Sequence, residues 1–260
     1  MPYTANTVRQ LIFDAHLHII DPRYPLTSNA GFLPDPFPVV AYQDRVASLG
    51  IRAGAVVSGS FQAFDQGYLM DALERLGPGY VGVTQLPPSV SDAELSELSA
   101  RGVRAVRFNL FRGGSATLAE LEGLARRAYD VAGWHAELYV HSRDLTELEG
   151  RLSALPKFSF DHLGMAGDGF DALIRLVEKG ARVKATGFGR IEHDPADAMR
   201  RINKANPNSL MFGTDLPSTR AERPFRPTDV DLVIDTLGPD DAARALWTNA
   251  LEFYGVQSRT

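Results

Sequence analysis

The sequence alternates eight times between short apolar runs rich in β-forming residues and longer amphipathic stretches, and no other feature constrains the fold as strongly. Strands alternating with helices predict a parallel sheet with the helices packed outside it. An open doubly wound sheet would show the same local pattern, but eight units within 260 residues favour a closed barrel. We therefore predict an α/β protein with a (β/α)8 TIM barrel in one domain, residues 1–260. The predicted strands are residues 11–18, 53–60, 80–86, 105–110, 136–141, 158–162, 182–186 and 210–215.

Local signals mark where several helices begin. Ser91 with Glu94, and Thr117 with Glu120, have the spacing of capping boxes. Asp194 followed by a proline is typical of an N-cap and a first helical position. Two further segments add to the eight units. The proline-bearing connection 20–38 predicts a lid or binding loop, and residues 240–253 predict an extra C-terminal helix.

Composition narrows the classes of partner and chemistry. Hydrophobic residues make up 44% of the chain and the net charge is −5, which favours neither nucleic acid nor an anionic membrane as a partner. The chain has no cysteine, so disulfides and thiolate chemistry are excluded. No run approaches the roughly 18 apolar residues of a membrane span, and residues 1–10 do not resemble a signal peptide. We therefore expect a soluble, cytoplasmic protein, with homo-oligomers left open.

The placement of histidines is the clearest functional signal. The active site of such a barrel lies at the carboxyl ends of its strands. Four of the six histidines fall at predicted strand ends, and Asp215 ends the eighth predicted strand. Chance would scatter histidines over helices and loops as well. The candidate site therefore consists of His16, His18, His141, His162 and Asp215.

The pair His16-x-His18 places two imidazoles on the same side of one strand, because side chains alternate along a strand. Two such imidazoles supply half of a divalent metal site. Asp215 lies beside them if the eighth strand pairs with the first, and His141 and His162 approach from the opposite wall. This set predicts one divalent metal, zinc or manganese, on His16, His18, His141 and Asp215. A water at an open position would lose its proton to a carboxylate.

Five motifs occur in a recognisable order: FDAHLHIID at 13–21, VRFNL at 106–110, FDHLG at 160–164, FGTDLP at 212–217 and WTNALEFYG at 247–255. Together they resemble the amidohydrolase superfamily (amidohydrolase-related family 2), in the branch that includes 2-pyrone-4,6-dicarboxylate lactonase. The resemblance covers nearly the whole chain. It implies a hydrolase that opens a lactone or related cyclic ester. Asp215 would be the general base, and His16, His18 and His162 would polarise the carbonyl with or without a metal.

The resemblance also implies how a small carboxylate-bearing substrate binds. Arg107 and Arg190 match arginines that bind carboxylates, and a guanidinium fork suits a bidentate pair. Ser60 and Tyr139 match further polar contacts. Arg112 lies one position out of register from another expected arginine, and Met165 replaces a further one. A carboxylate-bearing substrate with fewer carboxylates than the pyrone dicarboxylate therefore fits these residues equally well.

Several charged residues permit expectations of their own. Arg107 has inward parity, so it should have an anionic partner, either protein or ligand. Lys184 on the seventh strand should form an ion pair with Glu137 or Asp161. Three arginines follow Asp215 in a proline-bearing loop where solvation is expected, namely Arg220, Arg223 and Arg226.

Other functions fit the same residues. A metal-dependent decarboxylase of the same superfamily would use the two-histidine pair, His141, His162 and Asp215, and release of carbon dioxide would distinguish it. A phosphoesterase that begins with His-x-His usually ends with an Asp-x-His pair, whereas Leu216 and Pro217 follow Asp215 here. A barrel that binds a small carboxylate without catalysis is a third alternative. It would bind ligand unchanged after Asp215→Asn and turn over no substrate.

Overall fold

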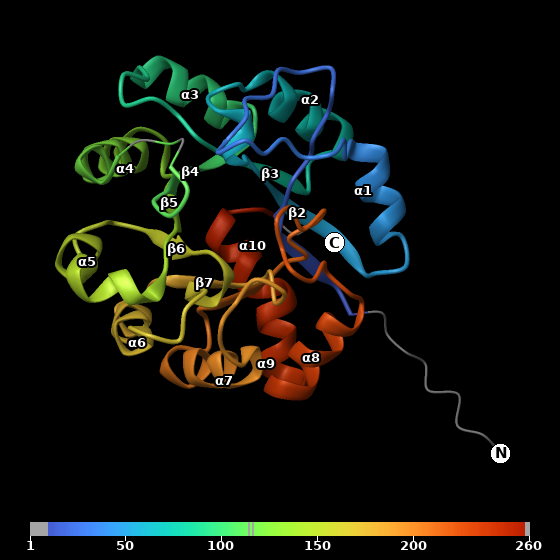
Figure 1. Ribbon diagram of the computed structural model, residues 1–260, viewed down its shortest axis with the longest axis vertical. Coiled ribbons are helices and arrows are strands. Elements are labelled where there is room, and N and C mark those ends of the chain that lie inside the picture. Colours follow the sequence, from blue (N-terminus) through green and yellow to red (C-terminus); the bar gives the residue numbers. More distant parts are fainter. Residues whose placement is uncertain (1–9, 114, 116, 258–260) are drawn as a thin grey trace.

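The computed structural model describes residues 10–257 except 114 and 116, and here eight parallel strands form one sheet in the order β1 to β8 (Figure 1). Helices alternate with the strands and surround them, which confirms the predicted (β/α)8 barrel. The polar segment 1–9 lies outside the described residues. The strands are β1 (Ile12–Leu17), β2 (Ile51–Val57), β3 (Tyr80–Thr84), β4 (Val103–Asn109), β5 (His135–Tyr139), β6 (Phe158–Phe160), β7 (Arg182–Ala185) and β8 (Leu210–Phe212).

The outer helices begin where the local signals predicted. Glu120 accepts hydrogen bonds from the backbone and hydroxyl of Thr117 at 2.9 and 2.7 Å, and Ser91 forms the corresponding box with Glu94. The Asp194 carboxylate accepts from two backbone N–H groups of the following turn. The helices are α1 (Val39–Val46), α2 (Gly67–Leu76), α3 (Asp92–Ala100), α4 (Leu118–Ala132), α5 (Leu145–Leu152), α6 (Phe170–Glu178), α7 (Pro195–Ala205) and α8 (Thr228–Leu237). Single 3₁₀ turns occur at Ser60–Gln62, Ser142–Asp144 and His162–Gly164.

The predicted C-terminal helix over 240–253 is present but divided. It comprises α9 (Pro239–Ala243), a π-helical turn at Arg244–Thr248 and α10 (Asn249–Tyr254). The Tyr254 ring stacks on Phe13 of β1 at 5.4 Å, and Phe253 packs against His135 at the start of β5. Both aromatic side chains join the small apolar residues inside the barrel. The helix therefore covers the amino ends of the strands and leaves the carboxyl ends open.

The barrel closes through the segment that follows β8. This strand ends at Phe212, three residues before the predicted end at Asp215, because the chain turns into a left-handed conformation at Asp215 (φ 58°). Beyond the strand, the backbone N–H of Asp215 donates to His16 O at 2.7 Å, and His18 N–H donates to Leu216 O at 2.8 Å. The closure therefore brings Asp215 directly beside the His-x-His pair.

A buried carboxylate reinforces this closure. Asp14 accepts hydrogen bonds from Thr214 N and Thr214 Oγ1, at 2.8 and 2.7 Å, and from the Tyr42 hydroxyl of α1 at 3.0 Å. Strict alternation would place Asp14 beside His16, but the register of β1 on β2 shifts between Asp14 and Leu17. The Asp14 side chain thus connects β1, α1 and the segment after β8.

Candidate active site

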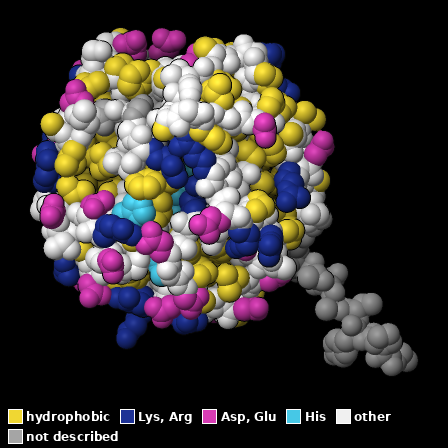
Figure 2. All heavy atoms as spheres, in the orientation of Figure 1, with side chains coloured by type: hydrophobic (Ala, Val, Ile, Leu, Met, Phe, Trp, Pro, Cys, Tyr) yellow, Lys and Arg dark blue, Asp and Glu magenta, His cyan; other side chains and the backbone are white. Residues whose placement is uncertain are grey.

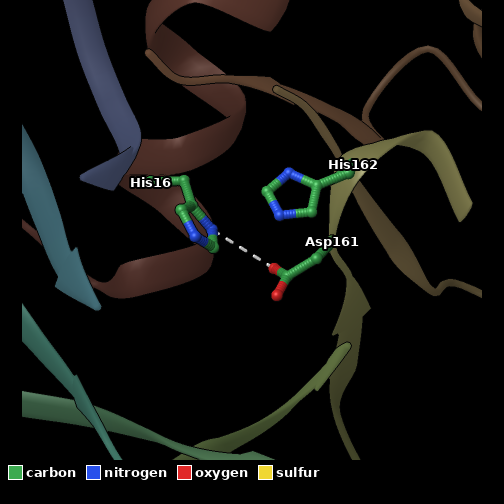
Figure 3. Close-up of side chains that lie close together, drawn as sticks. All are labelled: His16, Asp161 and His162. Atoms are coloured by element: carbon green, nitrogen blue, oxygen red, sulfur yellow. Dashed lines mark ion pairs between the residues drawn. The ribbon is translucent and has the colours of Figure 1, made fainter. Parts of the chain in front are cut away.

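Four predicted residues converge at the carboxyl end of the barrel. The Nε2 atoms of His16, His18 and His162 lie 3.9, 3.8 and 4.0 Å from one oxygen of Asp215, Oδ1. All four side chains are buried. They come from the end of β1, the turn after β6 and the segment after β8, so distant parts of the chain build one site. Figure 3 shows His162 and Asp161 on the side of the barrel that faces His16.

The backbone at two of these residues has a conformation uncommon for side chains other than glycine. His162 has φ 49° and Asp215 has φ 58°. Each such residue costs about 1–3 kcal/mol and persists where the surroundings enforce it. Both positions lie two or three residues beyond the end of a three-residue strand. The sharp turns there direct the imidazole and the carboxylate into the mouth of the barrel.

Hydrogen bonds on the far side of two imidazoles set their roles. His18 Nδ1 lies 2.7 Å from the carbonyl oxygen of Val57, which can only accept, so Nδ1 carries the proton and Nε2 the lone pair. His162 Nδ1 lies 2.8 Å from the Thr186 hydroxyl, which can donate or accept. Burial and the Arg107 charge lower the pKa of His18 to about 3. The His18 imidazole is therefore neutral at pH 7.

The two oxygens of Asp215 have different surroundings. Oδ2 accepts two hydrogen bonds from Arg190, with the Nε contact at 2.9 Å. Oδ1 has no hydrogen-bond partner among the described residues and faces the three imidazoles. Burial raises the pKa of Asp215, while the Arg190 charge opposes the rise. One oxygen is thus fixed, and the other is free to accept a proton.

A layer of buried ion pairs lies beneath the imidazoles. Lys184 Nζ is 2.5 Å from Glu137 Oε2, and Arg107 donates to Asp161 Oδ2 at 2.7 Å. His16 Nδ1 lies 3.3 Å from Asp161 Oδ1, the pair drawn in Figure 3. Both expectations about these charges are confirmed, since Lys184 pairs with Glu137 and Arg107 has an anionic protein partner. The motifs do not indicate that Asp161 supports His16, although Asp161 directly precedes His162.

The predicted substrate-binding residues line one cavity above the base. Ser60, Arg107, Arg112, Tyr139 and Arg190 surround it together with His18, His162 and Asp215. Figure 2 shows Lys and Arg side chains gathered around a hollow near the centre of the view. Phe32 of the predicted binding loop also lines the cavity, as does Arg220, which was expected to be solvated. The other two loop arginines do not line the cavity. Arg226 is exposed, as expected, whereas Arg223 forms an ion pair with Asp229.

His141 is not brought to the other predicted metal ligands. Two groups of described residues place ligand atoms within 4.8 Å of one another, namely His16 with His18 and Asp215, and His16 with Asp161 and His162. His141 belongs to neither group. Strand β5 ends at Tyr139, and the His141 ring packs on Phe111 with centroids 4.3 Å apart. The His141 ring thus lies against the loop after β4, one residue beyond the position that directly follows the strand.

Comparison with known proteins identifies the family. Residues 13–256 match the family model described as Amidohydrolase. The chain therefore belongs to the amidohydrolase family, which confirms the family and the hydrolase class predicted from the motifs. Within the described residues, every helix is too short or too polar to cross a bilayer.

Similar proteins include two curated hydrolases and one solved structure. The chain is 28% identical to 2-pyrone-4,6-dicarboxylate hydrolase of Comamonas testosteroni, over 78% of this chain and 76% of that protein. It is 26% identical to 4-sulfomuconolactone hydrolase of Rhizobium radiobacter, over 94% and 90% of the two chains. A probable 2-pyrone-4,6-dicarboxylic acid hydrolase of Acinetobacter baumannii, solved with citric acid bound, superposes with a TM-score of 0.81 at 20% identity. That alignment covers 94% of this chain and 99% of the other, which supports the same barrel fold.

Proposed function

We propose that this enzyme hydrolyses a lactone or related cyclic ester of a small carboxylate-bearing substrate, with Asp215 as the general base. One observation carries the proposal. Asp215 Oδ1 is buried, has no hydrogen-bond partner among the described residues and faces three imidazole nitrogens, while Arg190 fixes the other oxygen. The relatives named as hydrolases of a pyrone dicarboxylate and of a muconolactone support the choice of a cyclic ester.

The arrangement suggests how water is activated. A water between Asp215 Oδ1 and His18 Nε2 can donate one hydrogen bond to each, because both atoms are acceptors 3.8 Å apart. As the water oxygen attacks the ester carbonyl, its proton passes to Asp215. His18 is thus suited to orienting the water, since a nitrogen with a lone pair cannot donate to the carbonyl.

The remaining groups suit the carbonyl and the leaving oxygen. If the Thr186 hydroxyl donates to His162 Nδ1, then His162 Nε2 carries the proton and donates to the carbonyl oxygen. Arg107 and Arg190 add positive charge at the floor of the cavity, where that oxygen becomes negative. Collapse of the tetrahedral intermediate breaks the ring C–O bond. The proton held by Asp215 passes to the leaving oxygen, which yields a hydroxy acid.

The donor set also fits one divalent ion. His16 Nε2 and Asp215 Oδ1 are buried polar atoms without a hydrogen-bond partner among the described residues, and His18 Nε2 lies beside them. These three residues would hold zinc or manganese. A bound ion would polarise the carbonyl and lower the pKa of a water molecule. The decarboxylase alternative assumed His141 as a ligand, and the position of that ring away from this group weakens it.

The replacement Asp215→Asn tests the proposal. It keeps the shape of the side chain but removes the base, so we expect kcat for lactone hydrolysis to fall by about 10²–10⁴-fold. Ring opening is measured by proton release, with a headspace assay for carbon dioxide in parallel. The exposed replacement Asp235→Asn in α8 is the matched control and should not alter the rate. An unchanged rate in Asp215→Asn would remove Asp215 from the mechanism, and carbon dioxide release would favour the decarboxylase.

A further inference from the structure

Four arginines line the cavity above Asp215, and they fall into two pairs. Arg107 is engaged with Asp161 and Arg190 with Asp215, so the protein already compensates both charges. Within residues 10–257, except 114 and 116, Arg112 and Arg220 form no ion pair with a carboxylate. The cations available to an external anion are therefore the two that come from the loops after β4 and after β8.

Arg220 is held in place by the loop between β1 and α1. Its guanidinium donates to the backbone oxygen of Asn29 and, at 3.4 Å, to the Asn29 side chain. The same guanidinium lies 4.2 Å from the centre of the Phe32 ring. Asn29 and Phe32 face each other through paired backbone hydrogen bonds of 3.1 Å. These contacts fix the Arg220 side chain over the cavity. They also tie the long connection 20–38 to the loop after β8.

The loop that carries Arg220 is also tied to the catalytic base. Arg190, which binds Asp215 Oδ2, donates to the backbone oxygen of Thr219 at 3.0 Å. The residue next to Thr219 is Arg220, and its backbone is left-handed, with φ 58°. A strained residue in a position set by several contacts is typical of a functional site. The side chain is therefore positioned relative to Asp215 through a short chain of contacts.

Two like charges that face one space repel each other, and an anion that binds both removes this repulsion. Partial burial and the nearby Arg112 charge both lower the pKa of Arg220, as expected for two guanidinium groups facing one space. Guanidinium forks suit a carboxylate, which accepts two parallel hydrogen bonds. The cation–π contact of Arg220 with Phe32 leaves its charge uncompensated.

We propose that Arg112 and Arg220 form a carboxylate-binding subsite at the mouth of the cavity. This subsite binds an acidic group of the substrate that is remote from the hydrolysed bond, and Arg107 and Arg190 act at the reacting carbonyl. The proposal rests on the proposed lactone hydrolysis and deepens it. It specifies a lactone whose ring carries a carboxylate on the side away from Asp215.

Two matched probes test the subsite: 5-oxotetrahydrofuran-2-carboxylate, a lactone with one carboxylate, and its neutral methyl ester. We expect Arg220→Gln to raise KM for the acid by roughly 10- to 100-fold, the range for a hydrogen-bonded charge pair, with little change in kcat. KM for the ester should not change. Arg220→Lys, which keeps the charge but not the fork, should lie between Arg220→Gln and the unmodified protein. The exposed Arg226→Gln in the same loop is the control and should behave as the unmodified protein.

Equal losses for acid and ester would assign Arg220 a structural role and overturn the subsite, as would an unchanged KM for the acid. Calorimetric binding of the acid to the Asp215→Asn protein separates this result from failure of the proposed function. If no lactone is hydrolysed but the acid binds and Arg220→Gln abolishes binding, the subsite stands and the hydrolysis proposal fails. If the acid does not bind while the unmodified protein hydrolyses neutral lactones, the subsite proposal fails alone.

Discussion

His18 shows how one hydrogen bond restricts the chemistry of a residue. The sequence places its imidazole at a strand end but does not indicate which nitrogen carries the proton. The carbonyl of Val57, 39 residues away in the chain, decides this by accepting from Nδ1. The nitrogen that faces Asp215 is then a lone-pair donor for water or metal. A pattern of two histidines therefore predicts proximity well and the direction of proton transfer poorly.

The protonation of Asp215 should control the acidic limb of the activity. Burial raises its pKa above the usual 3.8, and the base works only when ionised. We therefore expect kcat/KM to fall as the pH drops through a value above 3.8. His18, whose pKa is lowered to about 3, should add no limb near 6.5. A pH profile of kcat/KM between 4 and 8 measures this, with circular dichroism to confirm folding at each pH.

A limb near pH 6.5 that disappears in His18→Asn would contradict this expectation, because it would show that burial and the Arg107 charge do not keep His18 neutral. An acidic limb that persists in His18→Asn, and whose midpoint pH changes when Arg190 is replaced by lysine, would agree with titration of Asp215. Arg190 is informative because its charge is the largest influence opposing the raised pKa of that carboxyl.

The site residues differ in how far the sequence could predict them. His16, His18, His162 and Asp215 follow strands, and parallel strands necessarily deliver their carboxyl ends to one edge of the barrel. His141 also follows a strand, but its ring packs on Phe111 of the loop after β4 instead of joining the other histidines. The position of Arg220 could not be predicted from the sequence, because it depends on contacts with Asn29 and Phe32. Asn29 lies 191 residues earlier in the chain. Such contacts between loops leave no periodic pattern in the chain.

At the scale of elements, the starts of helices were predicted more accurately than the ends of strands. A helix start depends on a few adjacent residues, as at Ser91 and Thr117, whose capping boxes are present. A strand ends where its partner ends or where the backbone turns. The predicted strand 210–215 continues past Phe212 to Asp215, yet the ladder stops at Phe212. The predicted strands therefore extended into turns that carry the site, because no local signal marks where the ladder ends.

The N-cap of α7 offers a test at this scale. Asp194 accepts from Ala196 N and Asp197 N at 3.0 and 3.3 Å. We expect Asp194→Ala to lower the free energy of unfolding by about 1 kcal/mol, since two backbone donors lose their acceptor. Urea unfolding followed by fluorescence measures the change. Asp44→Ala on the exposed face of α1 is the control, and an equal loss in both variants would mean that capping is not the cause.

At the scale of the whole molecule, the charges in the upper barrel compensate one another. Three cations, Arg107, Lys184 and Arg190, pair with three acids, Asp161, Glu137 and Asp215. Buried charges are tolerated when paired, whereas an unpaired buried charge is costly. The protein thus supplies a balanced set of charges around the site, drawn from five of its strands or strand ends.

This balance leads to an expectation about metal removal. A divalent ion at His16, His18 and Asp215 would be held by a single carboxylate whose charge Arg190 already compensates, which weakens the electrostatic attraction of the ion to the site. We therefore expect dialysis against a chelator to leave the hydrolysis rate unchanged. Metal analysis before and after dialysis, with activity measured on the same samples, tests this. A lost rate that one equivalent of zinc or manganese restores would contradict it and would support an ion on these three residues.

The contact of Arg220 with Asn29 and Phe32 also has a consequence for protein engineering. The loops that carry these residues are far apart in the chain, yet each holds the other over the cavity. A chimaera that takes only one of these loops from a relative would lose the contacts of Arg220 with Asn29 and Phe32 that join the two loops. Segments 20–38 and 218–226 should therefore be exchanged together when the substrate range is altered by recombination, while the buried charges below them are left in place.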